Sequence, residues 1–171
     1  MCYFLYMASP LTLSEVRSML PPGLTADLAS SSDHQLLKSI HPDAQTVARI
    51  LAGRCSCDLV RPRLDSVRED ERYLRERYRS LAVPRDNTIR ALEWHRQGLR
   101  QRPPAGGWPQ ALAKFIAEHA RNAGPTLFHL TFSLGGALDS PLSDARGITV
   151  DQVRASPEGW LIEATPVLVS R

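Results

Sequence analysis

The sequence begins with a continuous run of aromatic and aliphatic side chains from Cys2 to Met7. Such a run is typical of a β-strand that is buried on both faces, because a half-exposed strand alternates apolar and polar residues. Ser9-Pro10 ends this predicted strand. Val47 to Leu51 predicts a second strand, although the helix-forming residues in 44–51 also allow a helix. Thr126 to Leu134 predicts a third strand.

Helical patterns occupy most of the chain between these strands. Apolar spacing and capping residues predict a short helix at 13–20 and three longer ones at 65–81, 86–99 and 109–121. Residues 148–150 fit either a strand or a short helix, and 160–162 with 167–169 predict a final interrupted strand. This order predicts an α+β fold with a mixed sheet of about four to five strands from both ends of the chain. A central block of about three helices, within about 64–123, is expected on one face.

Length and composition predict one soluble domain. The chain has 171 residues, of which 43% are hydrophobic and 23% are charged, as in ordinary globular proteins. We therefore expect a single α+β domain spanning 1–171. No apolar run reaches the ~20 residues of a membrane span, and the N-terminus lacks a secretory signal pattern, so a cytoplasmic location is expected.

Three cysteines lie in or beside the first two predicted strands. Cys2 opens the first, while Cys55 and Cys57 belong to a turn that follows 47–51. If these strands are neighbours, the three thiols meet at one end of the sheet. An odd, low cysteine count does not suit a disulfide framework, so in a reducing compartment these thiols are free, metal-bound or catalytic.

Zinc is the metal that this set favours, because cysteine thiolates and histidine imidazoles are its usual ligands. The predicted site consists of Cys2, Cys55, Cys57 and His41, with His34 as an alternative fourth ligand. Its expected role is structural or regulatory. The competing interpretation is that Cys2 is simply a small buried hydrophobic residue.

A thiol-dependent enzyme is the first alternative, and the sequence assigns it no catalytic residue. Cys55 and Cys57 could form a redox pair. Removal of Met1 would expose Cys2 as an N-terminal nucleophile. The chain departs from amidotransferases of that class because Tyr3-Phe4 follows the cysteine and no Asn-Gly pair is present.

An interaction module is the second alternative. The formal net charge is +3, and arginine supplies almost all of the positive charge. Arginines with a tryptophan in the central helices could dock an acidic protein partner; they are Arg72, Arg75, Arg79, Arg90 and Trp94. Interleaved acidic residues argue against nucleic acid, and no membrane partner is expected.

The opening of the chain and the C-x-C turn resemble a group of small bacterial proteins without an established activity. Those proteins open with Met-Cys and an aromatic-rich strand and carry a Gly-Cys-x-Cys turn; the matching positions here are Met1, Cys2, 3–6, Ala8, Ser9, Gly53, Cys55 and Cys57. Arg54 and Asp58 depart from that pattern. The resemblance covers roughly the first third of the chain, and it implies that the three cysteines belong together.

Overall fold

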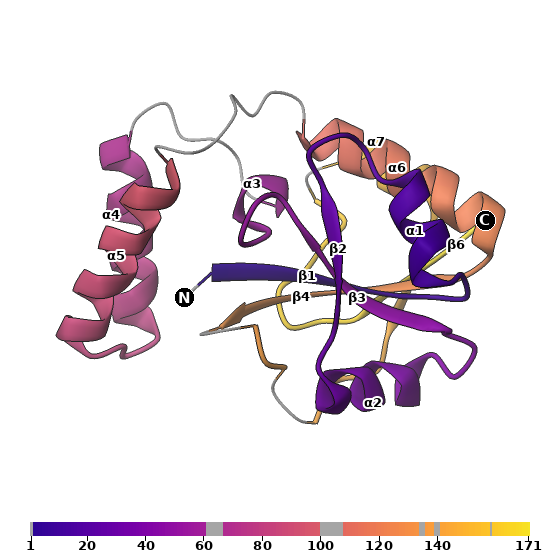
Figure 1. Ribbon diagram of the computed structural model, residues 1–171, viewed down its shortest axis with the longest axis horizontal. Coiled ribbons are helices and arrows are strands. Elements are labelled where there is room, and N and C mark those ends of the chain that lie inside the picture. Colours follow the sequence, from indigo (N-terminus) through magenta and orange to yellow (C-terminus); the bar gives the residue numbers. More distant parts are fainter. Residues whose placement is uncertain (1, 61–66, 100–107, 134–135, 139–140, 158) are drawn as a thin grey trace. The chain divides into compact units, whose positions relative to one another are not determined.

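The computed structural model describes residues 2–60, 67–99, 108–133, 136–138, 141–157 and 159–171 (Figure 1). Contacts divide the chain into two compact units, one containing Pro62–Gly106 and the other Cys2–Arg61 with Gly107–Arg171. Parts of the predicted central helical segment, at 64–66 and 100–107, lie outside the described residues. The single domain spanning 1–171 stays a prediction.

The larger unit contains a six-stranded mixed sheet in the order β2-β3-β1-β4-β6-β5. Its strands are β1 (Cys2–Ser9), β2 (Thr25–Leu28), β3 (Thr46–Leu51), β4 (Thr126–Ser133), β5 (Arg146–Thr149) and β6 (Val167–Ser170). Neighbouring strands are antiparallel except β5 and β6, which are parallel. The α+β class and the use of both chain ends are confirmed. The expected four to five strands were too few, because β2 has a single buried residue and no apolar run to predict it. Residues 148–150, which fitted either a strand or a short helix, divide between β5 and a helix that begins at Val150.

The central strands β1 and β4 come from distant parts of the chain. Every residue of β1 is buried, as the unbroken apolar run predicted. Leu5 lies opposite Ile50 of β3 on one side and opposite Leu130 of β4 on the other. The segment 47–51 is therefore a strand beside β1, and the rival helix is wrong. The segment 160–162 forms no strand, and only an isolated bridge joins Glu163 to Leu130.

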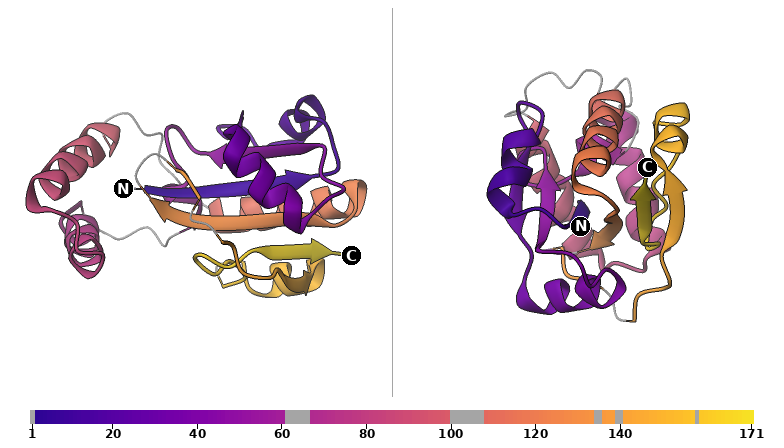
Figure 2. Two further views of the ribbon diagram at one scale, coloured as in Figure 1. Left: turned by 90° about the horizontal axis from the view of Figure 1, so that it is seen from below. Right: turned by 90° about the vertical axis from the view of Figure 1, so that its right-hand side faces the viewer.

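Helices cover both faces of this sheet. Ser9 of β1 lies 2.8 Å from Nε2 of His119 on α6 (Trp108–Ala123), whereas the Tyr6 hydroxyl donates to Asp33 of α2 (Ser31–Ile40) across 3.0 Å. Odd and even positions of a strand point to opposite faces. Thus α6 and α2 lie on opposite sides of the sheet, as Figure 2 shows. The expected cover of one face only was wrong, because α2, a helix that was not predicted, packs on the other face.

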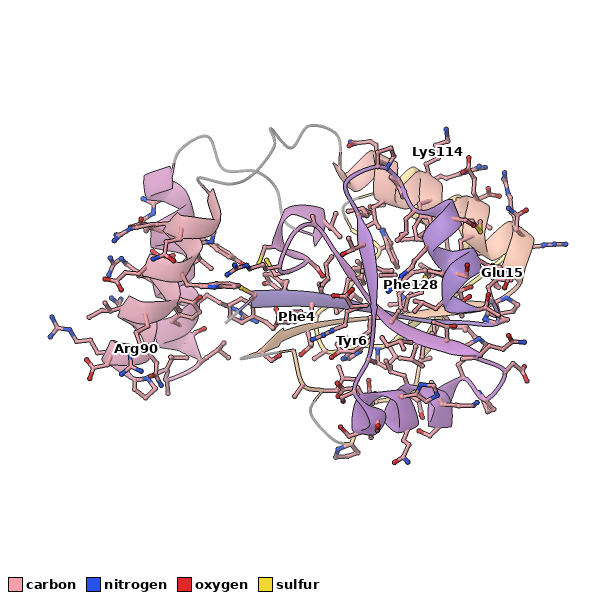
Figure 3. The ribbon with its side chains drawn as sticks, in the orientation of Figure 1. Phe4, Tyr6, Glu15, Arg90, Lys114 and Phe128 are labelled. Atoms are coloured by element: carbon pink, nitrogen blue, oxygen red, sulfur yellow. The ribbon has the colours of Figure 1, made fainter. Side chains whose placement is uncertain are left out.

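Short helices complete the larger unit. α1 (Leu13–Met19) is the short helix predicted at 13–20, and it begins with a capping box between Thr12 and Glu15. Figure 3 labels Glu15 in its first turn. α7 (Val150–Ala155) has a second capping box, and α3 (Cys57–Val60) is a single turn. Across the described ranges, no helix has the length and apolar character that a membrane span needs.

The smaller unit is a helical pair, α4 (Val67–Ser80) and α5 (Arg85–Leu99). Arg96 holds the Glu71 carboxylate through two nitrogens, at 2.5 and 2.8 Å. Leu74, Tyr78 and Leu92 are buried. Both helices were predicted, but of the three central helices only α6 belongs to the unit that contains the sheet.

Candidate metal centre

Cys2 is the first residue of β1 and lies opposite Ser133 of β4. Pairing with β4 holds its backbone, and the residue is only 6% exposed. Phe4 and Tyr6 follow on the same face of the strand (Figure 3). Cys2 is therefore held at one end of the most buried strand of the sheet.

The second half of the site is a tight turn after β3. Gly53 has φ +77°, a left-handed conformation that glycine adopts without a side-chain clash. The turn brings Cys55 back beside Ala52, whose N–H donates to the Cys55 carbonyl across 2.9 Å. Cys57 then opens α3, so both cysteines return towards β1.

Ser56 locks this turn onto β1. Its N–H donates to the Tyr3 carbonyl across 2.8 Å, and its hydroxyl donates to the Ile50 carbonyl across 2.6 Å. The same hydroxyl oxygen accepts the Leu5 N–H at 2.8 Å. A fully buried serine thus bridges β3 and β1 where direct pairing ends. Sequence reasoning missed this role, because a serine between two cysteines carries no pattern that reveals its partners.

The three sulfur atoms form one compact group, here called the cysteine cluster: Cys2, Cys55 and Cys57. Their Sγ atoms all lie within 4.8 Å of one another, and all three side chains are buried. Zinc–sulfur bonds of about 2.3 Å place the sulfurs of a tetrahedral site roughly 3.8 Å apart. That spacing is about 1 Å shorter than the 4.8 Å within which the three Sγ atoms lie. The predicted convergence of the three thiols is confirmed, and the cluster could hold a metal ion.

The surroundings oppose ionisation of the Cys2 thiol in the metal-free protein. Hydrogen bonds with Cys55 and Cys57, together with burial, raise the pKa of Cys2 far above its ordinary value. The Tyr3 N–H donates to the Cys57 sulfur across 3.3 Å, the kind of contact that stabilises charge on sulfur. A bound cation would favour the thiolate over the protonated thiol, because it draws electron density from each sulfur.

His41 lies at the opposite end of β1. It follows α2, and the neighbouring Gln45 donates its N–H to the Ser9 carbonyl. The eight residues of β1 separate that end from Cys2 by roughly 23 Å at the usual rise per residue. His34 lies on α2 as well. Among the described residues, the metal-ligand group contains the three cysteines and neither histidine.

The arginines proposed for docking are exposed on α4 and α5. These are Arg72, Arg75, Arg79 and Arg90, and Trp94 beside them is 37% exposed. Acidic residues interleave with them, and Glu71 lies within 4.0 Å of both Arg75 and Arg96. A docking role for this helical pair stays a prediction.

Comparison of the chain with models of protein families, with curated proteins and with solved structures found no match. The resemblance to small bacterial proteins with a Gly-Cys-x-Cys turn stays a prediction.

Proposed function

We propose that the cysteine cluster binds one zinc ion in a structural or regulatory role. The observation that carries this proposal is the mutual approach of three buried sulfur atoms to within 4.8 Å. Thiolate sulfur is a preferred ligand of zinc, and three such ligands already define most of a tetrahedral site.

The framework around the cluster supports a preformed site. Backbone and Ser56 hydrogen bonds fasten the turn to β1, and most of them do not involve a sulfur atom. A zinc ion would therefore add a cross-link to an existing arrangement. It would tie the first residue of a central strand to the turn after β3.

Protonation favours metal binding over thiol catalysis. A nucleophilic cysteine needs a lowered pKa, usually from a nearby cation or a helix N-terminus. Burial and neighbouring thiols instead raise the pKa of Cys2. This argues against Cys2 as the nucleophile of the thiol enzyme considered from the sequence.

The fourth zinc ligand must come from outside the cluster. The group of three sulfurs includes neither His41 nor His34, so we propose a water molecule or another oxygen or nitrogen donor. X-ray absorption at the zinc edge should show three sulfur ligands and one lighter atom.

Elemental analysis tests the proposal directly. Protein purified without chelator or metal-affinity resin should contain about one zinc per chain. Cys57→Ser should lose more than about tenfold in zinc affinity and unfold at a lower temperature. Ser39→Ala, at an exposed position on α2, is the matched control and should keep its zinc. A wild-type chain that cannot be loaded with zinc, or a Cys57→Ser variant with full zinc content and stability, would disprove the proposal.

A further inference from the structure

The cysteine cluster is a complete ligand set for an ion that takes three sulfur ligands. Its three Sγ atoms form one group within 4.8 Å, supplied by β1 and the turn that ends at Cys57. We propose that the cluster binds trivalent arsenic through all three sulfurs. This inference rests on the proposed function in one respect, because the same sulfurs must converge in solution, but it requires no fourth donor.

Coordination number is the first argument. Soft thiolates select soft ions, and trivalent arsenic forms three bonds and keeps a lone pair. Such an ion sits at the apex of a shallow pyramid whose base is the sulfur triangle. Zinc in the same position must still recruit a ligand from elsewhere. The three sulfur atoms of the cluster supply all the ligands that trivalent arsenic needs.

Charge is the second argument. Three thiolates around a divalent ion leave one net negative charge, whereas three thiolates around a trivalent ion leave none. The cluster is buried, with exposed fractions of 6%, 6% and 2% for Cys2, Cys55 and Cys57. A net charge at such a place has a large desolvation penalty. The neutral arsenic complex avoids it.

The binding reaction needs no oxidant or reductant. Arsenous acid exchanges its three hydroxyl groups for three cysteine sulfurs, so three As–O and three S–H bonds break and three As–S bonds form. Each thiol proton leaves in one of three water molecules. Arsenic stays trivalent throughout, and the reactant is a small uncharged molecule that suits an apolar surrounding.

The fold holds the three sulfurs in place while the ion binds. Ser56 fixes the turn through Tyr3, Ile50 and Leu5 with backbone and hydroxyl contacts. An ion bonded to sulfur leaves these contacts intact. The three ligands are therefore presented together before binding, which lowers the entropy cost of gathering them.

The test titrates the reduced full chain with sodium arsenite. Intact-mass spectrometry should show one arsenic per chain with the loss of three hydrogens, and all three thiols should become unreactive. X-ray absorption at the arsenic edge should show three sulfur ligands. Two sulfurs with one oxygen, or no binding, would overturn the inference.

Phenylarsine oxide supplies the matched comparison, because its arsenic bonds only two thiols and releases one water. Each single Cys→Ser variant should lose at least tenfold in affinity for arsenite yet still take up one phenylarsine oxide. Equal arsenite affinity in wild type and Cys55→Ser would contradict a three-sulfur site. If a variant does not fold, the wild-type X-ray absorption result still decides the question.

The two proposals fail separately. Zinc binding without arsenite binding would remove the further inference and leave the proposed function. Arsenite binding through three sulfurs without zinc binding would remove the proposed function and leave the further inference. Neither ion binding would show that the thiols do not converge in solution, and both proposals would fall.

Discussion

The Tyr3 N–H donates a hydrogen bond to the Cys57 sulfur across 3.3 Å, joining residues 54 positions apart in the sequence. The Tyr3 carbonyl accepts the Ser56 N–H in the same region, at 2.8 Å. The turn thus occupies the edge of β1 beyond the last pair with β3. The geometry of the cysteine cluster is consequently a property of the sheet, and substitutions in the sheet framework should alter metal binding.

Ser56→Ala should destabilise the protein by about 2 to 4 kcal/mol. The change removes two buried hydrogen bonds and leaves the Leu5 N–H and the Ile50 carbonyl without this partner. Urea unfolding of the metal-free protein measures the loss, and zinc affinity should fall with it. Ser39→Ala, an exposed serine on α2, serves as the control. Unchanged stability in Ser56→Ala would show that the hydroxyl does not bridge the strands.

Gly53→Ala should cost about 1 to 2 kcal/mol through backbone strain alone. Its φ of +77° disfavours a side chain, while an added Cβ would have no atom within 4 Å. Gly147→Ala is the matched control, because its Cβ also has open space and its φ lies outside the left-handed region. Thermal unfolding should separate the two variants. Equal transition temperatures would argue against a left-handed turn at Gly53.

Zinc affinity should rise steeply as the pH increases from about 6 to about 9. The pKa of Cys2 is raised in the metal-free protein, so its thiol carries a proton across this range and must lose it to bind zinc. Calorimetric titrations in buffers with different protonation enthalpies measure the protons released. We expect about two or more per zinc ion. An affinity independent of pH would mean that zinc binds elsewhere.

His119 should make the protein less stable as the pH falls. Burial lowers its pKa from 6.5 to about 4, so the unfolded chain binds the proton more strongly than the folded one. This contribution is intact above about pH 6.5 and is lost progressively towards pH 4, by up to about 3 kcal/mol. His119→Gln should show a shallower decline in urea unfolding between these pH values. Parallel curves for the two proteins would contradict this role.

Sequence patterns predicted the parts of the fold that have strong local signals. The apolar run of β1 and the short helix at 13–20 are visible without any tertiary contact, and both are confirmed. β2 and β5 have mostly exposed side chains, so their pairing depends on neighbours that the local sequence does not reveal. α2 was not predicted, because its first residues, from the Ser30 cap to Asp33, are as typical of turns as of helix starts.

The candidate site was predictable in its sulfur ligands and not in the rest. Three cysteines near two strands were enough to predict that the thiols converge, because adjacent strands bring their ends together. The sequence did not reveal the chain direction: β3 runs antiparallel to β1, so the segment before β3 meets Ser9 and the segment after it meets Tyr3. His41 precedes β3 and Cys2 lies at the other end of β1, and His41 as a zinc ligand stays a prediction.

The positions of the strands in the sequence determine when each part of the sheet can assemble during synthesis. β1, β3 and the Cys57 turn leave the ribosome well before β4, which begins at residue 126. Until then one edge of β1 lacks its partner, and such an apolar edge invites association with other nascent chains. An ion captured early by the cysteines would fasten the β1–β3 half at this vulnerable stage. The supply of that ion during translation would then govern how much of the newly made protein escapes aggregation.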